Sequence, residues 1–280
     1  MSIQWFPGHM AKARREITEK LKLVDIVIEL LDARIPISSR NPMIDEIVKQ
    51  KPRIVLLNKS DLADPKIMNE WAEFFEKKGL KALSISSSSG RGISNIFRTA
   101  EELVAEKREA LIKKGVKPRA VRAMILGIPN VGKSSLINRL ANRSVAKTGD
   151  RPGVTKGQQW IKVGKSLELL DTPGILWPKF EDVQVGYRLA ATGAIKDELL
   201  HFDDIALFIV DYFKKYYPEK LKTRYNLDQL PSDNVEIIEL IGRKRGCLIS
   251  GGKIDFDKAA EIIVRELRAG KLGRFCLEKP

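Results

Sequence analysis

The sequence predicts an α/β protein with a doubly wound, mostly parallel sheet, followed by a small all-α domain. Two observations predict this fold. Short apolar, β-branched segments alternate with helical patterns through the first part of the chain, which is typical of parallel strands joined by helices. Beyond Pro178 the strand patterns end and helical patterns alone remain. We therefore expect two domains, residues 1–178 with an N-terminal arm and residues 179–280.

The elements of the first domain follow in order from apolar runs and end signals. After a basic helical pattern in the arm at residues 1–23, strands are expected at 26–31, 54–57, 82–85 and 123–126. Helices are expected at 41–49, 65–78, 92–114 and 133–142. Pro65 suits a first helical position, and Gly79 and Gly115 suit helix ends.

A hairpin and a group of helices complete the expected fold. The hairpin is predicted from residues 158–163 and 167–170, which Gly164 separates, and it adds to one side of the sheet. The second domain is expected to hold helices near 184–200, 203–217, 232–242 and 256–268. Pro218, Pro231 and two glycines at 251–252 lie between these helices.

The composition favours a soluble, cytoplasmic protein with a polyanionic partner. The formal net charge is +14 with a pI near 9.7, and all of the positive excess lies in residues 1–180. No apolar run approaches the roughly 18–20 residues of a membrane-spanning helix, and no signal peptide is recognisable. Cys247 and Cys276 are too few for a disulfide framework, so we expect two reduced thiols. We expect a monomer without membrane contact.

Residues 127–134, Gly-Ile-Pro-Asn-Val-Gly-Lys-Ser, match the phosphate-loop pattern and lie between a predicted strand and a predicted helix. Lys133 is expected to neutralise the β- and γ-phosphate oxygens as a catalytic cation, and Ser134 to bind Mg²⁺. The residues expected to contact the nucleotide here are Asn130, Val131, Gly132, Lys133, Ser134 and Ser135.

A second motif, Asp171-Thr172-Pro173-Gly174, follows the apolar strand at 167–170. Asp171 is expected to hold Mg²⁺, usually through a water, and the Gly174 N–H to meet the γ-phosphate. Thr155 is expected to bind Mg²⁺ and the γ-phosphate from the loop at 148–157, with Thr148 as the alternative.

Residues 58–61, Asn-Lys-Ser-Asp, predict selectivity for guanine. The Asp61 carboxylate can accept both N–H groups on one edge of guanine, and adenine has no matching pair. Asn58 would join this segment to the phosphate loop, and the Lys59 stem can lie along the purine face. Ser86 and Ser87, at the end of the next strand, belong to a serine run expected to offer a backbone N–H to guanine O6.

The order of these motifs is permuted. In an ordinary GTPase the phosphate loop comes first, whereas here the guanine motif precedes it and Asp171–Gly174 comes last. The sheet keeps the same neighbours when the usual termini are joined and the chain is cut elsewhere. Because the cut falls just after Gly174, residues 174–178 lead directly into the helical domain, and we expect the nucleotide to control the orientation of that domain.

Two further segments, Trp5-Phe6-Pro7-Gly8-His9-Met10 and Asp32-Ala33-Arg34-Ile35-Pro36, together with the permuted motifs, resemble the ribosome biogenesis GTPase A family of circularly permuted GTPases. The similarity covers the whole chain. It implies GTP hydrolysis stimulated by ribosomal particles, binding of ribosomal RNA, and action late in assembly of the large (50S) ribosomal subunit, with release after hydrolysis.

The resemblance also bears on catalysis and cofactors. Ordinary small GTPases place a water-orienting glutamine after the Asp-x-x-Gly motif, but Ile175 stands here. The family implies that His9 replaces it, and the alternative is that His9 caps the arm or stacks on Trp5. Asn130 resembles an asparagine that binds K⁺ in related GTPases. His201 is expected to be structural.

The candidate RNA contacts are basic residues of the arm and of the second domain, with tyrosines for stacking on bases. They are Lys12, Arg14, Arg15, Lys20, Lys22, Lys214, Lys215, Lys220, Lys222, Arg224, Arg243, Lys244 and Arg245, with Tyr212, Tyr216, Tyr217 and Tyr225. The alternative for each is a solvated helix face or a core aromatic. For the chain as a whole, the alternatives are an RNA-binding scaffold that uses GTP as an ordering ligand, and a P-loop kinase or ATPase, which the guanine motif disfavours.

Overall fold

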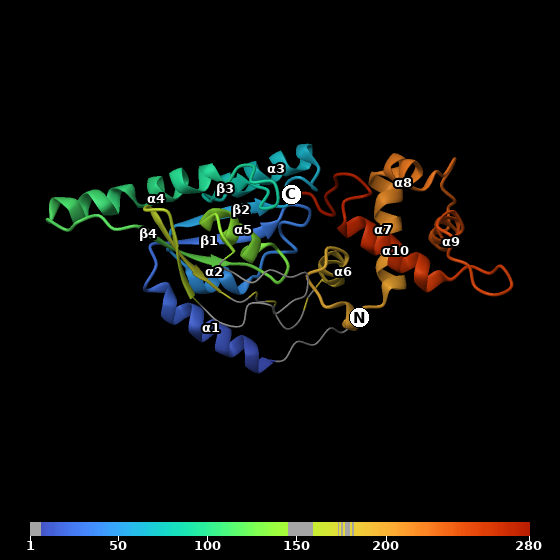
Figure 1. Cartoon of the computed structure of the whole chain (residues 1–280), viewed down its shortest axis with the longest axis horizontal. Coiled ribbons are helices and arrows are strands. Elements are labelled where there is room, and N and C mark those ends of the chain that lie inside the picture. The colour runs from blue at the N-terminus through green and yellow to red at the C-terminus, as the bar shows by residue number, and fades with distance from the viewer. Residues whose placement is uncertain (1–6, 145–158, 173, 175, 177–179, 181) are drawn as a thin grey trace.

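The computed structural model describes residues 7–144, 159–172, 174, 176, 180 and 182–280, with side chains from residue 14 in the first helix and from residue 160 in the fifth strand. A six-stranded sheet lies at the centre of the N-terminal part, in the order β3-β2-β1-β4-β6-β5 (Figure 1). The strands are β1 (Ile26–Asp32), β2 (Arg53–Asn58), β3 (Lys81–Ser84), β4 (Val121–Leu126), β5 (Gln159–Val163) and β6 (Leu167–Asp171). All neighbours pair in parallel except β5 and β6. The predicted fold class and edge hairpin are confirmed.

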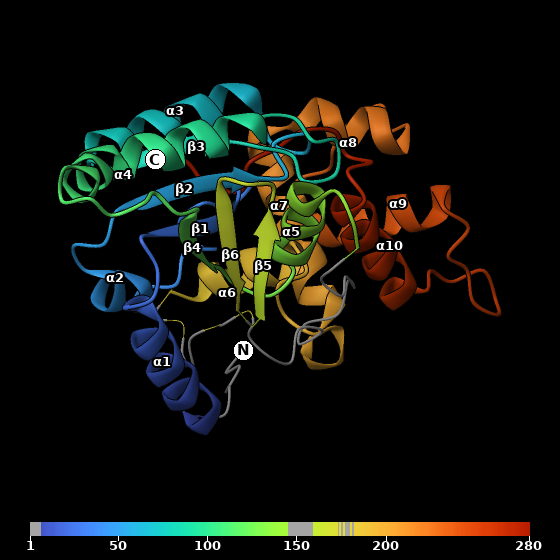
Figure 2. The ribbon, with the colours of Figure 1, turned by 60° about the vertical axis from the view of Figure 1, so that its left-hand side comes forward.

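Helices cover both faces of this sheet because its strands are apolar on both sides. They are α1 (Pro7–Leu21), α2 (Met43–Val48), α3 (Pro65–Lys77), α4 (Ser94–Lys113) and α5 (Lys133–Ala141). Ile28 and Leu30 of β1 pack in the apolar cluster that includes α4 and α5. Val27 and Leu31, which point to the other face, pack in clusters with α1, α2 and α3. Figure 2 shows α1 and α4 on opposite sides of the sheet.

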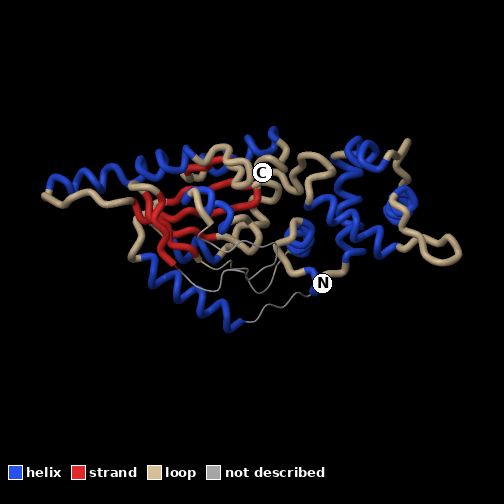
Figure 3. The backbone as a smooth tube through the Cα atoms, in the orientation of Figure 1, coloured by secondary structure: helices blue, strands red, loops and turns tan. Residues whose placement is uncertain are grey.

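The C-terminal helices, residues 182–273, gather at one end of the sheet (Figure 3). They are α6 (Val183–Ala191), α7 (Phe202–Tyr216), α8 (Pro218–Tyr225), α9 (Asn234–Lys244) and α10 (Phe256–Arg268), with a 3₁₀ turn η1 (Asp197–Leu199). Buried Ile205, Ile209 and Phe213 of α7 and Ile263 of α10 belong to the same apolar cluster as β1 and β4. The sheet and these helices therefore share a continuous apolar core.

One helix end in this region was predicted wrongly, and helix α8 was not predicted at all. The helix expected near 184–200 ends at Ala191, because Gly193 follows with a φ of 83° and closes the helix. Pro218 was expected to separate helices, but it opens α8 as the first helical residue. A first helical position needs no intrahelical N–H donor, so proline fits there.

The expectation of two reduced thiols agrees with the described part of the chain. Cys247 and Cys276 are both buried and unbonded to each other. Among the described residues, no helix is both long enough and apolar enough to cross a bilayer.

Candidate functional site

The predicted motifs meet at one edge of the sheet, where the parallel strands end. Asp32 at the end of β1 pairs in register with Asn58 at the end of β2. Strands β4 and β6 continue the same parallel set, so the loop after Leu126 and the loop after Asp171 open at that edge too. In doubly wound sheets ligands bind outside these carboxyl ends.

The phosphate loop has the backbone shape that its glycines predict. Gly132 has a φ of 101°, and a Cβ built there would lie 2.4 Å from Asn58 Nδ2. A Cβ on Gly127 would lie 2.6 Å from the carbonyl oxygen of Leu30. Neither position therefore tolerates a side chain, because the loop is pressed against β1 and Asn58. Lys133 then begins α5, so the loop ends at a helix N-terminus, where anions bind.

Lys133 and Asp171 form the charged centre of the site. The Lys133 ammonium is buried and donates to the carbonyl oxygens of Gly127 and Ile128, each at 2.9 Å. Burial lowers the pKa of Lys133 to about 8, against the attraction of Asp171. Burial also raises the pKa of Asp171, against the attraction of Lys133. Phosphate oxygens would replace the carbonyl partners of this cation and favour its charged form.

The residues at this centre fit a magnesium ion. Both carboxylate oxygens of Asp171 are buried and have no hydrogen-bond partner among the described residues. Mg²⁺ binds carboxylate and hydroxyl oxygens and keeps several waters. Asp171, with Ser134 at the start of α5, is thus the donor set that would hold such an ion.

Gly174 lies against the phosphate loop. A Cβ built on it would lie 2.7 Å from Pro129 N and 2.8 Å from Lys133 Nζ. Glycine is required there because any side chain would collide with backbone. The second motif and the phosphate loop are therefore in contact at the point where a γ-phosphate was expected.

Asn58 joins three loops that are distant in the sequence. Its Nδ2 donates to the Val131 carbonyl oxygen at 2.8 Å. Its Oδ1 accepts from the Ser87 backbone N–H at 3.0 Å and from the Ser87 hydroxyl at 2.9 Å. The link from Asn58 to the phosphate loop that the sequence predicted is present, and the serine run is tied to the same side chain.

The base loop, residues 58–62, presents a carboxylate that lacks a full set of partners. Asp61 Oδ1 is buried without a hydrogen-bond partner among the described residues, and Oδ2 lies 3.5 Å from the Ser88 hydroxyl. Lys59 has a left-handed backbone with a φ of 61°, and its ammonium lies 3.0 Å from Asp32 Oδ2. The Lys59 stem is therefore fixed at both ends beside Asp61.

Two supporting residues were missed by sequence reasoning. Arg139 of α5 donates to the carbonyl oxygens of Ser87 and Ser88 and so holds the serine run. Asp32 holds Lys59 as described, and it also accepts from the Arg34 side chain at 2.9 and 2.7 Å. Arg139 and Ser87 are 52 residues apart in the sequence, so no local pattern links them. Asp32 and Arg34 belong to a motif that was noted only for its family resemblance.

Several predicted residues lie outside the described residues. They are Trp5, Thr148, Thr155 and Ile175. His9 lies in the first turns of α1, but its side chain is outside the description. Leu176, next to Ile175, is buried at 2% exposure. His201 precedes α7 as its N-cap residue, with no side-chain capping hydrogen bond.

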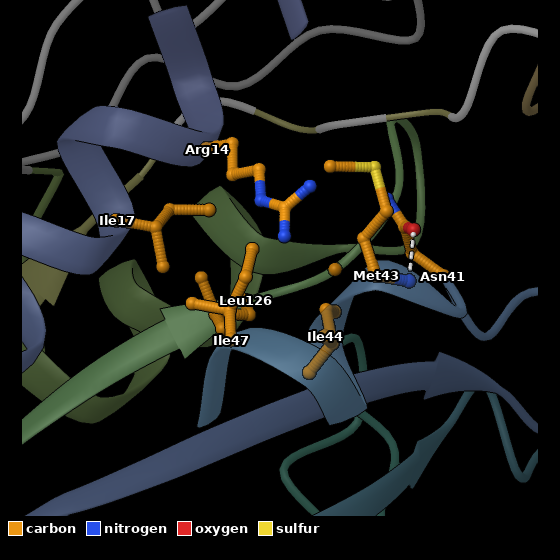
Figure 4. Close-up of a pocket in the computed structure, with 8 residues that line it drawn as sticks. Arg14, Ile17, Asn41, Met43, Ile44, Ile47 and Leu126 are labelled. Atoms are coloured by element: carbon orange, nitrogen blue, oxygen red, sulfur yellow. Dashed lines mark hydrogen bonds between the residues drawn. The ribbon is translucent and has the colours of Figure 1, made fainter. Parts of the chain in front are cut away.

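Helix α1, which carries His9, is seated next to the phosphate loop. Arg14 and Ile17 of α1 line a small, largely apolar pocket with Ile47 of α2 and with Leu126 and Gly127 (Figure 4). Ile17 is buried at 3% exposure. Helix α1 therefore packs on the sheet domain beside the first glycine of the phosphate loop.

The structure narrows the set of candidate RNA contacts. Tyr225 is 2% exposed, so the expectation that it stacks on RNA bases is wrong, and its helical spacing reflects a core position. Tyr212 and Tyr217 pack in an aromatic row with Phe208 and Phe213, whereas Tyr216 is 43% exposed.

Many of the candidate cations have partners within the protein. Arg224 and Arg245 pair with Glu266, Lys222 pairs with Glu219, and Lys214 and Lys220 donate to carbonyl oxygens. Arg14 and Arg15 make exposed ion pairs, which a polyanion can displace cheaply. The remaining exposed candidates with described side chains are Lys22, Lys215, Arg243 and Lys244.

Comparison with known proteins gives a consistent result. Residues 122–243 match the family model described as 50S ribosome-binding GTPase. The chain is 60% identical over 280 residues to ribosome biogenesis GTPase A of Bacillus cereus, covering all of this chain and 95% of that protein. It is 32% identical over 278 residues to the protein of that name from Thermotoga maritima, covering 99% of this chain and 95% of the other.

Solved structures with a similar fold include two of T. maritima YlqF. The GDP-bound structure aligns with a TM-score of 0.65 and 30% identity, covering 95% of this chain and 99% of that one. The GNP-bound structure aligns with a TM-score of 0.65, covering 96% and 98%.

Proposed function

The chain belongs to the ribosome biogenesis GTPase A family and hydrolyses GTP to GDP and phosphate, and we propose that it does so while bound to ribosomal RNA late in assembly of the large ribosomal subunit. Hydrolysis then drives its release from the precursor particle. We propose that the protein acts in the cytoplasm as a monomer. The motif order is that of a circularly permuted GTPase.

One observation carries the nucleotide part of the proposal. Asn58 bonds directly to the phosphate loop and to the serine run, which brings base recognition and phosphate binding together in one site. Asp61, with a buried oxygen lacking a described partner, suits the two N–H donors of guanine. Since the Ser86 and Ser87 N–H groups already donate to Arg91 O and Asn58 Oδ1, the Ser88 N–H is the donor we assign to guanine O6.

We assign the phosphate end to Lys133, Ser134 and Gly174, with Mg²⁺ held by Ser134 and Asp171 and with Thr155 as a further ligand. A bound Mg²⁺ would stabilise charge that develops on the phosphate oxygens. Asn130 is our candidate for K⁺. Cations bind amide oxygens, so Oδ1 is the atom of Asn130 that would bind K⁺, while its amide nitrogen donates to the Gly193 carbonyl oxygen at 2.7 Å.

His9 is our candidate for orienting the attacking water. Helix α1, which carries His9, contacts the start of the phosphate loop through Arg14 and Ile17, and the described Leu176 is a buried apolar residue that cannot polarise water. His9→Ala is expected to leave GTP affinity unchanged and to lower particle-stimulated turnover by roughly 10² to 10⁴. Lys133→Ala is the contrasting variant, because it should abolish nucleotide binding itself. Wild-type turnover by His9→Ala on ribosomal particles would remove this assignment.

The RNA part rests on the net charge of +14 and on the family. Sedimentation of the protein with large-subunit precursors in the presence of GDP, GTP or a non-hydrolysable GTP analogue tests it. We expect co-sedimentation with the analogue and loss of the complex with GDP. Single-turnover hydrolysis with and without particles tests the stimulation. Equal sedimentation in every nucleotide state would contradict release by hydrolysis.

A further inference from the structure

The last residues of the chain leave the C-terminal helices and return to the edge of the sheet. These residues, 274–279, are called the C-terminal tail here. Phe275, Cys276 and Leu277 are each 0% exposed, so the tail is part of the core.

The tail binds the loop that follows β1, residues 32–38, which we call the arginine loop. The Leu277 N–H donates to the Arg34 carbonyl oxygen at 2.8 Å. The Glu278 carboxylate accepts from the Ser38 backbone N–H at 3.1 Å, from the Ser38 hydroxyl at 2.5 Å and from the Ile37 N–H at 2.5 Å. The Arg34 guanidinium lies 5.7 Å from the centre of the Phe275 ring.

The tail also touches the base loop directly. The Phe275 N–H donates to the Leu62 carbonyl oxygen at 3.0 Å. Leu62 in turn packs against Gly270, where a Cβ would lie 2.7 Å from the leucine side chain. The segment just after Asp61 is therefore fixed by residues at the very end of the chain.

The arginine loop is itself bonded to the base loop. The Ala33 N–H donates to the Asn58 carbonyl oxygen at 2.8 Å. Asp32, whose side chain is 4% exposed, holds both Arg34 and Lys59. A positive φ is unfavourable for a residue with a side chain, so the Lys59 backbone needs such external contacts to persist.

The other side of the tail is bound by the C-terminal helices. Arg188 of α6 donates to the Leu277 carbonyl oxygen at 3.0 Å and lies 3.5 Å from the Glu278 carboxylate. The Tyr217 hydroxyl accepts from the Cys276 N–H at 3.1 Å. The tail is thus held between the C-terminal helices and the two loops that flank the expected guanine site.

We propose that the C-terminal tail is a positioning element for guanine recognition, which makes the placement of Asp61 depend on how the C-terminal helices are docked. Glu278 is its main anchor, because its buried carboxylate joins Arg188 on one side to Ser38 on the other. The inference rests on the assignment of Asp61 to guanine made above. By linkage, a partner that shifts the C-terminal helices changes guanine-nucleotide affinity, and the nucleotide changes the affinity for that partner by the same factor.

The test compares GDP with inosine diphosphate on the full chain. Inosine lacks the exocyclic amine, so it offers Asp61 one N–H donor instead of two. If Glu278→Gln moves the base loop, GDP affinity should fall by about 5- to 30-fold, within the usual range of coupling between sites, and inosine diphosphate affinity should fall much less. The preference for GDP therefore shrinks. Simple loss of stability would weaken both nucleotides equally.

Glu266→Gln is the matched control. Glu266 is buried to a similar degree, 8% exposed against 7% for Glu278, and it pairs with Arg224 and Arg245 inside the C-terminal helices. Both GDP affinity and the GDP preference should stay at the wild-type values in this variant. A changed preference in Glu266→Gln would overturn the proposal, because the effect would then not depend on the tail.

A second measurement needs no variant. Hydrogen exchange at the Phe275 and Leu277 amides of the wild-type protein should slow when GDP binds, since positioning is reciprocal. Unchanged exchange, or a wild-type GDP preference in a folded Glu278→Gln, would overturn the proposal and leave the assembly function untouched. A wild-type protein that binds both nucleotides equally would refute the Asp61 assignment, and the role of the tail with it.

Discussion

Neutralising Asp32 should destabilise the protein strongly. The Asp32 and Arg34 side chains are 4% and 2% exposed and form a two-bond ion pair at 2.9 and 2.7 Å. Lys59 lies 3.0 Å from the same carboxylate. Asp32→Asn keeps the shape of the side chain but leaves the Arg34 charge buried without its counter-charge. The variant therefore tests how much this pair stabilises the arginine loop.

The magnitude follows from the contacts. The change removes charge-assisted hydrogen bonds to Arg34 and Lys59, each worth about 1.5–3 kcal/mol. The amide oxygen of the variant can still accept one of these bonds, so the lost counter-charge sets the cost: removing one partner of a buried ion pair generally costs about 3–5 kcal/mol. We expect the free energy of unfolding of Asp32→Asn to be lower than that of the wild type by about 3–5 kcal/mol at pH 7.

The effect also has a defined pH dependence. Burial raises the pKa of Asp32, but Arg34 and Lys59 outweigh it and hold the pKa of this carboxyl well below its ordinary value of 3.8. A lowered folded-state pKa means that the stability is present above the ordinary pKa and is lost as the pH falls toward the folded-state value. The difference between wild type and Asp32→Asn should therefore narrow below about pH 4.

Urea unfolding followed by circular dichroism, at a series of pH values, measures both effects. Asp197→Asn is the control, because Asp197 pairs with Arg268 at 2.8 Å but is 43% exposed, and such pairs contribute about 1 kcal/mol or less. Equal stability of Asp32→Asn and wild type at pH 7, or a difference that persists unchanged at pH 3, would refute the reasoning.

The nucleotide site gives three further predictions. Asn58→Ala should weaken GDP binding by roughly 10- to 100-fold, since it removes three hydrogen bonds that join the loops, and a fluorescent GDP analogue measures this. Asp171→Asn should abolish the gain in GTP affinity that Mg²⁺ gives, as a titration with and without chelator would show. Burial lowers the pKa of Lys133 to about 8, so above that pH the free protein holds a neutral lysine that must take up a proton when GDP binds. GDP affinity should therefore fall above about pH 8, and calorimetry in two buffers measures the proton uptake.

The centre of the site could be predicted from the sequence because its chemistry is local. Gly127, Gly132 and Lys133 are close in the chain, and their spacing is imposed by the backbone that must enclose a phosphate. Asn58 and Asp61 could be placed with them because parallel strands end at a common edge. The parallel sheet with helices on both faces follows from the alternation of strand and helix patterns.

The supporting contacts could not be predicted, for physical reasons. Arg139 contacts the serine run from a helix face, and Glu278 contacts the arginine loop from the C-terminal tail. A single charged residue in such a place has no pattern to distinguish it from a solvated one. Tyr225 shows the opposite difficulty. A tyrosine at helical spacing fits both a core and an RNA-stacking position, and its burial is decided by tertiary packing.

The C-terminal helices contact the two ends of the nucleotide site in different ways, and this determines what hydrolysis can change. At the phosphate end, Gly193 after α6 accepts from Asn130 of the phosphate loop, and Gly174 precedes α6 in the sequence. At the base end, the tail contacts Leu62, next to the Asp61 that we assign to guanine. On the assignments proposed above, loss of the γ-phosphate would remove a ligand at the phosphate end alone, so we expect the helices to turn about the tail and stay attached through it. This arrangement predicts that the GDP-bound and GTP-bound structures share the tail contacts and differ in the Asn130–Gly193 contact.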